Sequence, residues 1–561
     1  MVTVSPKRKW LSLLMFITAI TAINIAGQYF YARIDFTREK RFTLTKTSRE
    51  LIENAGKPVI ITVFLEGELP AAFQRLRNAT KDLLGDYKAY AGTDIKIVFE
   101  DPISGLSGAE RDTVINNLYQ LGIEPTTINI KNNDGFAQKL VFPMAIVEAG
   151  DHHIPVKLLQ NLDAAGSYEQ NINHSIQNLE YVFTSAIQKV LSGDRPRIGF
   201  TEGNGELSDL YLSDALKSLS EGYEAGRVNL DLIDHDGLDK LKLLIVAKPQ
   251  KQFTEAQKYK LNYFIMNGGR VVWCIDQVNA DLDSMARSGE QLALNRTLNL
   301  DDMLFMYGAR VNYNLLADAN CAEIPLSMGG QEAQIQMAPW VYYPLLMPDT
   351  ASSIVKNIDV VRSEFVSTVD TIGVKGITKK ILLWSSAFNK VHPAPKLLSL
   401  QMVSEQPDPK SYASVPHAVG VLLEGSFPSV FLNRAVPSGV SGNYSVPVQS
   451  KSNKMIVIGD GDVFKNQVSS RDGSAFPLGF DRYTQRNYGN KALLLNIADF
   501  LTNDTDLISL RNKEVKIRLL DKAKIRTSRV YWQLINVAGP LLMLILFAIF
   551  QHYYRRHKYA R

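Results

Sequence analysis

The chain has 561 residues, 45% of them hydrophobic, and its 62 basic and 57 acidic side chains give a formal net charge of +5. This hydrophobic content is normal for folded globular protein, and no stripe of mixed aromatic and basic residues favours nucleic-acid binding. The two cysteines, Cys274 and Cys321, exclude a disulfide framework and a four-ligand zinc site. Their spacing does not decide whether they pair.

An uncharged apolar stretch lies near each end of the chain, at 10–31 and at 530–551. Each would form about 33 Å of helix, against a hydrocarbon layer of about 30 Å. We therefore predict two transmembrane helices. A cleaved signal peptide is the alternative for 10–31, but the apolar run is longer than the about 7–15 residues of such a segment.

The two short tails, 1–9 and 552–561, predict the orientation of these helices. They contain seven basic residues and no acid. Because positively charged flanks stay in the cytoplasm, both termini are expected inside and the body outside, in the periplasm of a bacterial inner membrane. The positive net charge of the chain then comes from these cytoplasmic tails, which are also expected to contact anionic membrane lipid. Four residues are expected to help the spans pack against partner helices, or to kink them: Ala19, Ala22, Gly539 and Pro540.

Residues 33–160 predict a small periplasmic α/β domain. Thr47-x-x-Glu50 is a capping box that would start a first short helix. Period-2 and helical patterns then predict, in order, strand 58–65, helix 70–91, strand 94–100, helix 108–121 and strands 127–131, 140–148 and 153–158. This order is typical of a thioredoxin-like domain, although the absence of Cys-x-x-Cys excludes its redox chemistry.

Residues 168–191 repeat apolar side chains at helical spacing and predict a helix that connects two domains. The second domain, 195–505, alternates apolar strands with helices. We expect strands at 197–201, 243–247, 270–275 and 454–459, and helices at 207–221, after the capping box Thr254-x-x-Gln257, and at 489–502. Such strands indicate a parallel sheet buried on both faces, of flavodoxin-like type.

Residues 300–450 are expected to form a β-rich insertion in this second domain. Strand-like pieces occur at 355–370, 380–384 and 417–424. The segment 435–453 is rich in Ser, Gly, Pro and Asn, which predicts a mobile loop. A basic connector, 507–529, would then lead back to the second span, and an N-terminal connector, 33–45, would join the first span to the small domain.

Two loops that follow predicted strands are candidate ligand or partner loops. The first contains Glu202, Asn204 and Glu206, and the second contains Asp460 and Asp462. Ligands bind outside the carboxyl ends of strands in open α/β sheets, but the first loop has neither nucleotide-binding glycine pattern. The second pair could hold Mg²⁺ or Ca²⁺, but no third acid is in register. Structural turns are the favoured interpretation, with no metal, cofactor or catalytic residue.

No residue pattern predicts a hydrolase nucleophile, because no Gly-x-Ser-x-Gly or Gly-x-Cys-x-Gly elbow occurs. The pair His152-His153 sits at a predicted hairpin tip without further ligands at metal spacing. The residues alone therefore predict a non-catalytic, membrane-anchored binding or scaffolding protein.

Five motifs, in order, resemble the GldG family, the gliding-motility-associated ABC transporter auxiliary components of Bacteroidetes, over nearly the whole chain. They are Asp35–Thr45, Leu179–Val190, Ile198–Glu206, Lys248–Gly269 and Tyr488–Asn496. Relatives often have Gly-His-Gly-Glu where this chain has Gly203-Asn204-Gly205-Glu206.

The resemblance implies a substrate-binding or auxiliary component beside an ABC permease and a cytoplasmic ATPase that hydrolyses ATP. It also implies that the second domain is similar to glutamine-amidotransferase-like domains that have lost their nucleophile. We expect the body to couple permease movement to a substrate or an envelope protein. Two alternatives stay open: a membrane-anchored periplasmic hydrolase that uses both candidate loops, and a mechanical scaffold of the gliding or secretion machinery.

Overall fold

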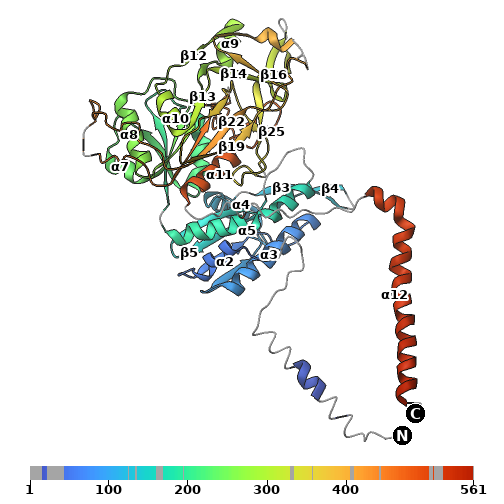
Figure 1. Ribbon diagram of the computed structural model, residues 1–561. Coiled ribbons are helices and arrows are strands. Elements are labelled where there is room, and N and C mark those ends of the chain that lie inside the picture. Colours follow the sequence, from blue (N-terminus) through green and yellow to red (C-terminus); the bar gives the residue numbers. More distant parts are fainter. Residues whose placement is uncertain are drawn as a thin grey trace. The chain divides into compact units, whose positions relative to one another are not determined.

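A computed structural model of the chain describes residues 10, 15–21, 43–123, 125–132, 135–159, 168–193, 195–328, 334–356, 358–404, 410–440, 442, 444–469, 471–503, 510 and 522–559. The chain divides into two compact units, Met1–Lys513 and Glu514–Arg561. Figure 1 shows the first as two α/β bodies and the second as a single long helix. Overall, this is a mixed α/β protein with sheets rich in parallel strands.

The first body is a four-stranded sheet in the order β2-β1-β5-β6. Strands β1 and β2 are parallel, whereas β5 is antiparallel to both β1 and β6. Strands β3 and β4 form a separate hairpin. The bounds in this body are α2 Lys46–Glu53, β1 Val59–Val63, α3 Ala71–Tyr90, β2 Ile95–Phe99, α4 Gly108–Gln120, β3 Thr126–Asn132, β4 Gly135–Val141, β5 Met144–Ala149, β6 His152–Lys157 and α5 Tyr168–Ser192.

Two predictions for this body are wrong in detail. The single strand expected at 140–148 is divided between β4 and β5, because Pro143 has no N–H to donate and the chain bends there, with Met144 N bonding Phe142 O at 2.8 Å. Helix α2 is capped by Thr45, whose side chain accepts from Ser48 N, and not by Thr47. The cap therefore lies two residues earlier than the capping-box pattern indicated.

Helix α5 covers the small sheet and supplies much of its core. It packs against α3, β5 and β6. Its buried side chains on this side include Ile172, Leu179, Phe183 and Ile187. The predicted apolar spacing of the helix is thus explained by burial against the sheet.

The second body is built on one large mixed sheet in the order β15-β16-β19-β22-β23-β10-β9-β7-β8, with β17 paired to β16. Strands β8, β7, β9, β10 and β23 are parallel. Their bounds are β7 Arg197–Glu202, β8 Glu224–Asn229, β9 Leu241–Ala247, β10 Arg270–Cys274 and β23 Asn453–Ile458. The expected parallel strands are confirmed, including the return of the chain at β23. Strand β8 was not predicted, because a partly exposed edge strand has no continuous apolar run.

The insertion is not a separate layer beside the parallel sheet. Its strands continue that sheet in antiparallel pairs, β22 with β23, β19 with β22 and β16 with β19. Strand β22 is buried along most of its length, so a core covers both faces here as well. The strands of this half are β15 Cys321–Met328, β16 Gln334–Pro348, β17 Val361–Arg362, β19 Ile377–Trp384 and β22 Ala418–Gly425.

Helices and small sheets complete the second body. Helices α6 and α11 belong to one apolar core and α8 and α10 to the other. The helices are α6 Asp209–Ser220, α7 His235–Asp239, α8 Glu255–Met266, α9 Leu282–Ser288, α10 Asp301–Tyr307, the 3₁₀ helix η1 Leu400–Ser404 and α11 Asn490–Thr502. The remaining strands are β11 Val278–Asn279, β12 Glu290–Asn295, β13 Ala309–Val311, β14 Asn314–Asp318, β18 Val369–Thr371, β20 Asn389–Pro393, β21 Lys396–Ser399, β24 Phe480–Asp481 and β25 Arg486–Asn487.

Part of the loop predicted to be mobile is held by aromatic contacts. Tyr444 packs edge-on against Tyr259 and Tyr263 of α8, with ring centroids 6.1 and 4.9 Å apart. Its ring also lies tilted against His235, with centroids 5.6 Å apart. The predicted capping box at the start of α8 is confirmed, with Thr254 and Gln257 bonding each other's backbone N–H.

The second unit is helix α12, Lys522–Tyr559. Its stretch Tyr531–Lys558 is long and apolar enough to cross a membrane. The backbone leaves helical angles at Ser528, outside this stretch, and Pro540 lies inside the helix. A Cβ at Gly539 would meet no atom within 4 Å.

Most of the first predicted span lies outside the described residues. Within 10–31, only residue 10 and residues 15–21 are described, and the latter are helical. Ala19 is exposed on that turn of helix, whereas Ala22 is outside the described part.

Candidate functional site

The carboxyl ends of three neighbouring parallel strands bring together a lysine and three aspartates. Lys248 follows β9, Asp276 follows β10, and Asp460 and Asp462 follow β23. Because these strands are adjacent in the order β23-β10-β9, residues far apart in sequence meet at one sheet edge. Open α/β sheets bind ligands at this edge, which makes the cluster the first site to consider.

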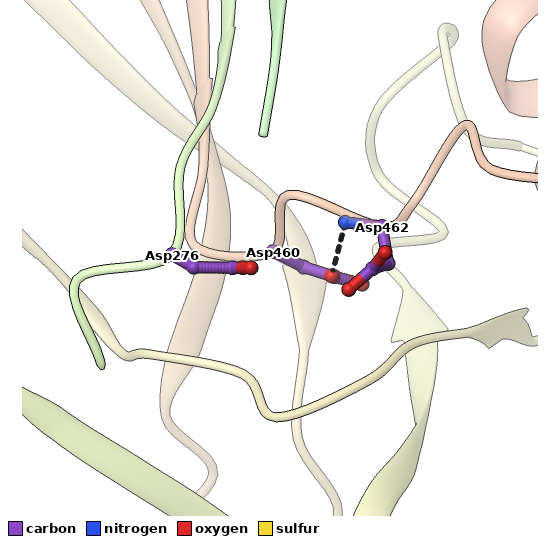
Figure 2. A group of neighbouring side chains, drawn as sticks. All are labelled: Asp276, Asp460 and Asp462. Atoms are coloured by element: carbon purple, nitrogen blue, oxygen red, sulfur yellow. Dashed lines mark hydrogen bonds between the residues drawn. The ribbon is translucent and has the colours of Figure 1, made fainter. Parts of the chain in front are cut away.

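The three aspartates are buried and close together (Figure 2). One carboxylate oxygen from each lies within 4.8 Å of the others. Backbone N–H groups of the turn after β23 hold two of them, since Gly461 N donates to Asp276 Oδ1 at 2.5 Å and Asp462 N donates to Asp460 Oδ1 at 2.8 Å. The structure therefore supplies the third acid, Asp276, that the sequence pattern lacked.

Lys248 places its ammonium group among these carboxylates. Its Nζ bonds Asp462 Oδ2 and lies 3.6 Å from Asp276 Oδ2, with 11% of the side chain exposed. The residue adopts a left-handed backbone conformation, with φ at 56°. Its backbone passes so close to Gly461 that a Cβ there would stand 2.8 Å from Lys248 Cβ. A strained backbone and a glycine thus hold this lysine in place.

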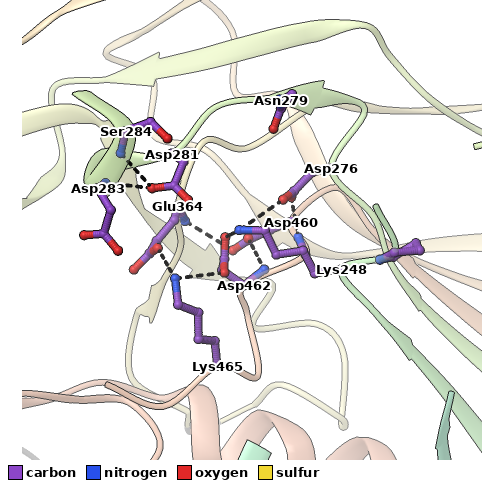
Figure 3. A network of polar contacts seen from close by, with 12 residues as sticks. Lys248, Asp276, Asn279, Asp281, Asp283, Ser284, Glu364, Asp460, Asp462 and Lys465 are labelled. Carbon is purple, nitrogen blue, oxygen red and sulfur yellow. Dashed lines mark hydrogen bonds and ion pairs between the residues drawn. The ribbon is translucent and has the colours of Figure 1, made fainter. Parts of the chain in front are cut away.

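A second layer of charges surrounds the first (Figure 3). Lys465 Nζ lies 3.1 Å from Asp462 Oδ1 and 3.0 Å from Glu364 Oε2. Glu364 in turn pairs with Arg362 at 2.7 Å. Positive and negative groups therefore alternate along the network.

The pKa shifts describe a charge-balanced network. Burial, followed by the neighbouring Asp276 and Asp462, raises the pKa of Asp460 well above its usual range. Burial opposes the charged form of Lys248, but its carboxylate neighbours outweigh burial and raise its pKa. Burial would likewise raise the pKa of Glu364, but Lys465 and Arg362 outweigh it and lower that pKa. Four acids, Asp276, Asp460, Asp462 and Glu364, thus lie beside Lys248, Lys465 and Arg362, and the positive charge of Arg296 acts on Asp276 as well.

This balance decides how well the cluster suits a metal ion. Three carboxylates within 4.8 Å of one another are a reasonable ligand set for Mg²⁺ or Ca²⁺. However, the Lys248 ammonium already lies between two of them, and a divalent ion there would stand in contact with another cation. The residues present therefore fit a cluster in which lysine takes the place of the ion.

The other candidate loop is held by its neighbours. Asn204 is buried, its carbonyl accepts from Gln250 N and Lys251 N, and its side-chain amide donates to Gln257 at 3.0 Å. Glu206 accepts from Asn204 N at 2.7 Å. Glu202 pairs with Arg227 at 3.3 Å. The loop after β7 thus joins the loop after β9 and fills the space between these strands.

The network contains five residues that the sequence analysis did not select as site residues: Lys248, Asp276, Arg362, Glu364 and Lys465. For the first two a signal existed, since both follow strands that were predicted. Only the order of those strands in the sheet places them beside Asp460.

Comparisons with known proteins match most of the chain. Residues 195–497 match the model of a family described as an ABC-type uncharacterized transport system, and residues 38–148 match a domain of unknown function. An uncharacterized protein of Borreliella burgdorferi is 20% identical over 501 residues, covering 87% of this chain and 86% of that protein. A solved structure of the mmIFT52 N-terminal domain matches with 14% identity and a TM-score of 0.32, over 55% of this chain and 99% of that one.

Proposed function

Since this chain belongs to the ABC-type uncharacterized transport system family and is an auxiliary component of such a system, we propose that it couples movement of an ABC permease to a periplasmic body. In this proposal the chain crosses the inner membrane twice, through 10–31 and 530–551, with both termini in the cytoplasm. Its partners are the permease, a cytoplasmic ATPase and a substrate or envelope protein outside.

The observation that carries this proposal is α12, an apolar helix at the end of a chain whose body matches the family. Tyr531 and Trp532 pack edge-on at one end of its apolar stretch, with ring centroids 5.6 Å apart. Tyr554 stacks on Phe550 at the other end, and Lys558 lies over the Tyr554 ring. Aromatic pairs at both ends and a basic terminus are typical of a spanning helix with its last residues in the cytoplasm.

The body supports a binding role more than a catalytic one. At the sheet edge where a ligand is expected, the charges of Lys248 and Lys465 compensate the acids, and Asn204 fills the neighbouring loop. Glu206 and Asp460, the acids that a hydrolase would use, both accept backbone hydrogen bonds. The side chains at this edge are therefore held by contacts within the body, which supports a binding or scaffolding role more than catalysis.

The strand orders support the finer fold proposals. The small sheet, with two parallel strands followed by two antiparallel ones, supports a thioredoxin-like domain. The five parallel strands of the large sheet, numbered by their order in the chain, run 2-1-3-4-5, which is the flavodoxin-like order.

Co-purification from native membranes tests the proposal. A tagged full chain is expected to retain a permease and an ATPase, and a chain with 530–551 replaced by an unrelated span is expected to lose them while staying in the membrane. Recovery of the chain without a permease would refute the coupling role. Reporters fused to each terminus test the orientation, and a periplasmic signal from either one contradicts it.

Two variants separate the binding role from the hydrolase alternative. Glu206→Gln and Asp460→Asn keep the shape of each side chain and remove its acid function. Binding or scaffolding predicts intact function in cells for both, whereas a hydrolase predicts loss of function with normal assembly. Gliding, the role suggested by the GldG resemblance, is tested by colony spreading after deletion and complementation with the full chain.

A further inference from the structure

A buried carboxylate joins the two bodies of the first unit. Asp499 lies in the last turn of α11, and its side chain is 12% exposed. It accepts hydrogen bonds from Tyr181 of α5 at 2.5 Å and from Tyr223, and it pairs with Lys189 of α5 at 2.8 Å. The Lys189 ammonium also lies over the Tyr223 ring, 4.7 Å from its centroid. One acid on the large body thus receives two groups from the small body.

The start of the small body is bound to the same part of α5. Thr45 N, at the cap of α2, donates to Glu180 Oε1 at 2.7 Å. Ser48 Oγ lies 3.0 Å from Thr184 Oγ1, inside the protein. These contacts join the end of the predicted N-terminal connector and the first turn of α2 to the middle of α5.

Both predicted connectors to the membrane therefore lead to one short stretch of α5. The N-terminal connector ends at the residues that bond Glu180 and Thr184, and α11 ends at Thr502, just before the C-terminal connector. Glu180 and Tyr181 are neighbours in sequence. Glu180 accepts from Thr45 at the start of the small body, and Tyr181 donates to Asp499 of the large body. We propose that residues 180–189 of α5 form a transmission element, in which Asp499 is a latch that couples the membrane connectors to the angle between the two bodies. This inference rests on the proposed coupling function.

A cleft of about 920 Å³ beside the latch is what such a movement would change. Its walls come from α5 and β6 on the small body and from α6 and α11 on the large body. The lining contains charges of both signs: the pairs Lys491 with Asp214 and Lys189 with Asp499, and also Lys157, Lys217 and Glu221. The lining therefore does not specify the charge of a ligand. In this proposal, the latch sets the width of the cleft.

The chemistry of the latch suits a two-position contact. A buried ion pair adds little net stability compared with apolar packing, but breaking it leaves an uncompensated charge. The contact is therefore sharply favourable in one geometry and unfavourable in nearby ones. Burial alone would raise the pKa of Asp499, but Lys189 and the two tyrosine hydroxyls outweigh burial and lower it, so the acid stays charged.

Spin-label distance measurements on the full chain in lipid nanodiscs test the latch. Labels replace Lys157 and Lys217, which are exposed on opposite walls of the cleft, in a Cys321→Ser background that leaves only buried Cys274. We expect one narrow distance distribution, which at least doubles in width in both Asp499→Asn and Lys189→Met. Glu364→Gln is the matched control, because it removes a buried paired carboxylate within the large body alone. It should leave the distribution unchanged.

Hydrogen exchange on the same proteins provides the second measurement and shows that each variant is folded. Asp499→Asn should speed exchange in α5 and α11, and Glu180→Ala should speed it in α2 and α5. Unchanged distances and exchange in folded Asp499→Asn and Lys189→Met would overturn the latch, whether or not a permease co-purifies. Altered distances in a chain that retains no permease would leave the latch standing and refute the coupling function instead.

Discussion

Replacing Lys248 by serine removes the central cation of the buried network. Asp462 then keeps only Lys465 as an ion-pair partner, and Asp276 loses the ammonium 3.6 Å from its Oδ2. Breaking one side of a buried ion pair costs about 3–5 kcal/mol, because the remaining charge stays buried. Serine has the same Cβ as lysine, so the left-handed backbone strain at this position is unchanged by the substitution.

Thermal unfolding of the full chain, followed by tryptophan fluorescence, measures this loss. Trp273 lies in β10, next to the network, and is fully buried. At about 2 °C per kcal/mol for a large domain, the Tm of Lys248→Ser should fall by about 6–10 °C. Lys240→Ser, an exposed lysine just before β9, is the control and should leave Tm within about 1 °C.

The same variant tests whether lysine takes the place of a metal ion. Without its ammonium, the three aspartates should bind Ca²⁺ or Mg²⁺, and an ion at 100 times its Kd would restore about 2.7 kcal/mol. The unsubstituted chain should gain nothing from the same salt. A Tm of Lys248→Ser equal to that of the unsubstituted chain, or equal stabilisation of both by Ca²⁺, would refute the reasoning.

Three further predictions concern single side chains. Burial, together with Lys396 and Lys390, lowers the pKa of His392 to about 4. Because the unfolded pKa is near 6.5, the contribution of neutral His392 to the unfolding free energy is fully present above that pH and is lost as the pH falls from there toward 4. His392→Gln should flatten this part of a pH–Tm curve. Thr45→Ala should lower the unfolding free energy by about 1 kcal/mol while Thr47→Ala has little effect in urea titrations, and the reverse order would contradict the observed cap. Tyr444→Ala should make the 435–453 loop more sensitive to limited proteolysis without a change in far-UV circular dichroism.

Local patterns in the sequence predicted most elements of the fold. Helices α3, α5, α8 and α11 have apolar residues at helical spacing, and the Thr254 capping box marks the start of α8. Strand β8 was missed because an edge strand needs no continuous apolar run. The Thr45 cap was missed because its partner is Ser48, which does not complete the usual box pattern.

The candidate site depended on information that local patterns do not contain. Asp460 and Asp462 were selected from a turn after a strand, but their partners come from other strand ends, Lys248 from β9 and Asp276 from β10. Glu364 comes from the insertion, between β17 and β18. The decision between a metal site and a charge-balanced network required the sheet order, since only that order brings a lysine between the acids.

The position of β23 in the large sheet has a consequence for biosynthesis. This strand separates β10 from β22, so β10 keeps an open edge until the ribosome has made residues 275–452 and then β23 itself. At about 5–20 residues per second, this interval lasts roughly 10–35 s. During its synthesis the nascent chain therefore presents an apolar strand with unsatisfied backbone groups, so we expect a chaperone to shield it until the missing neighbour emerges.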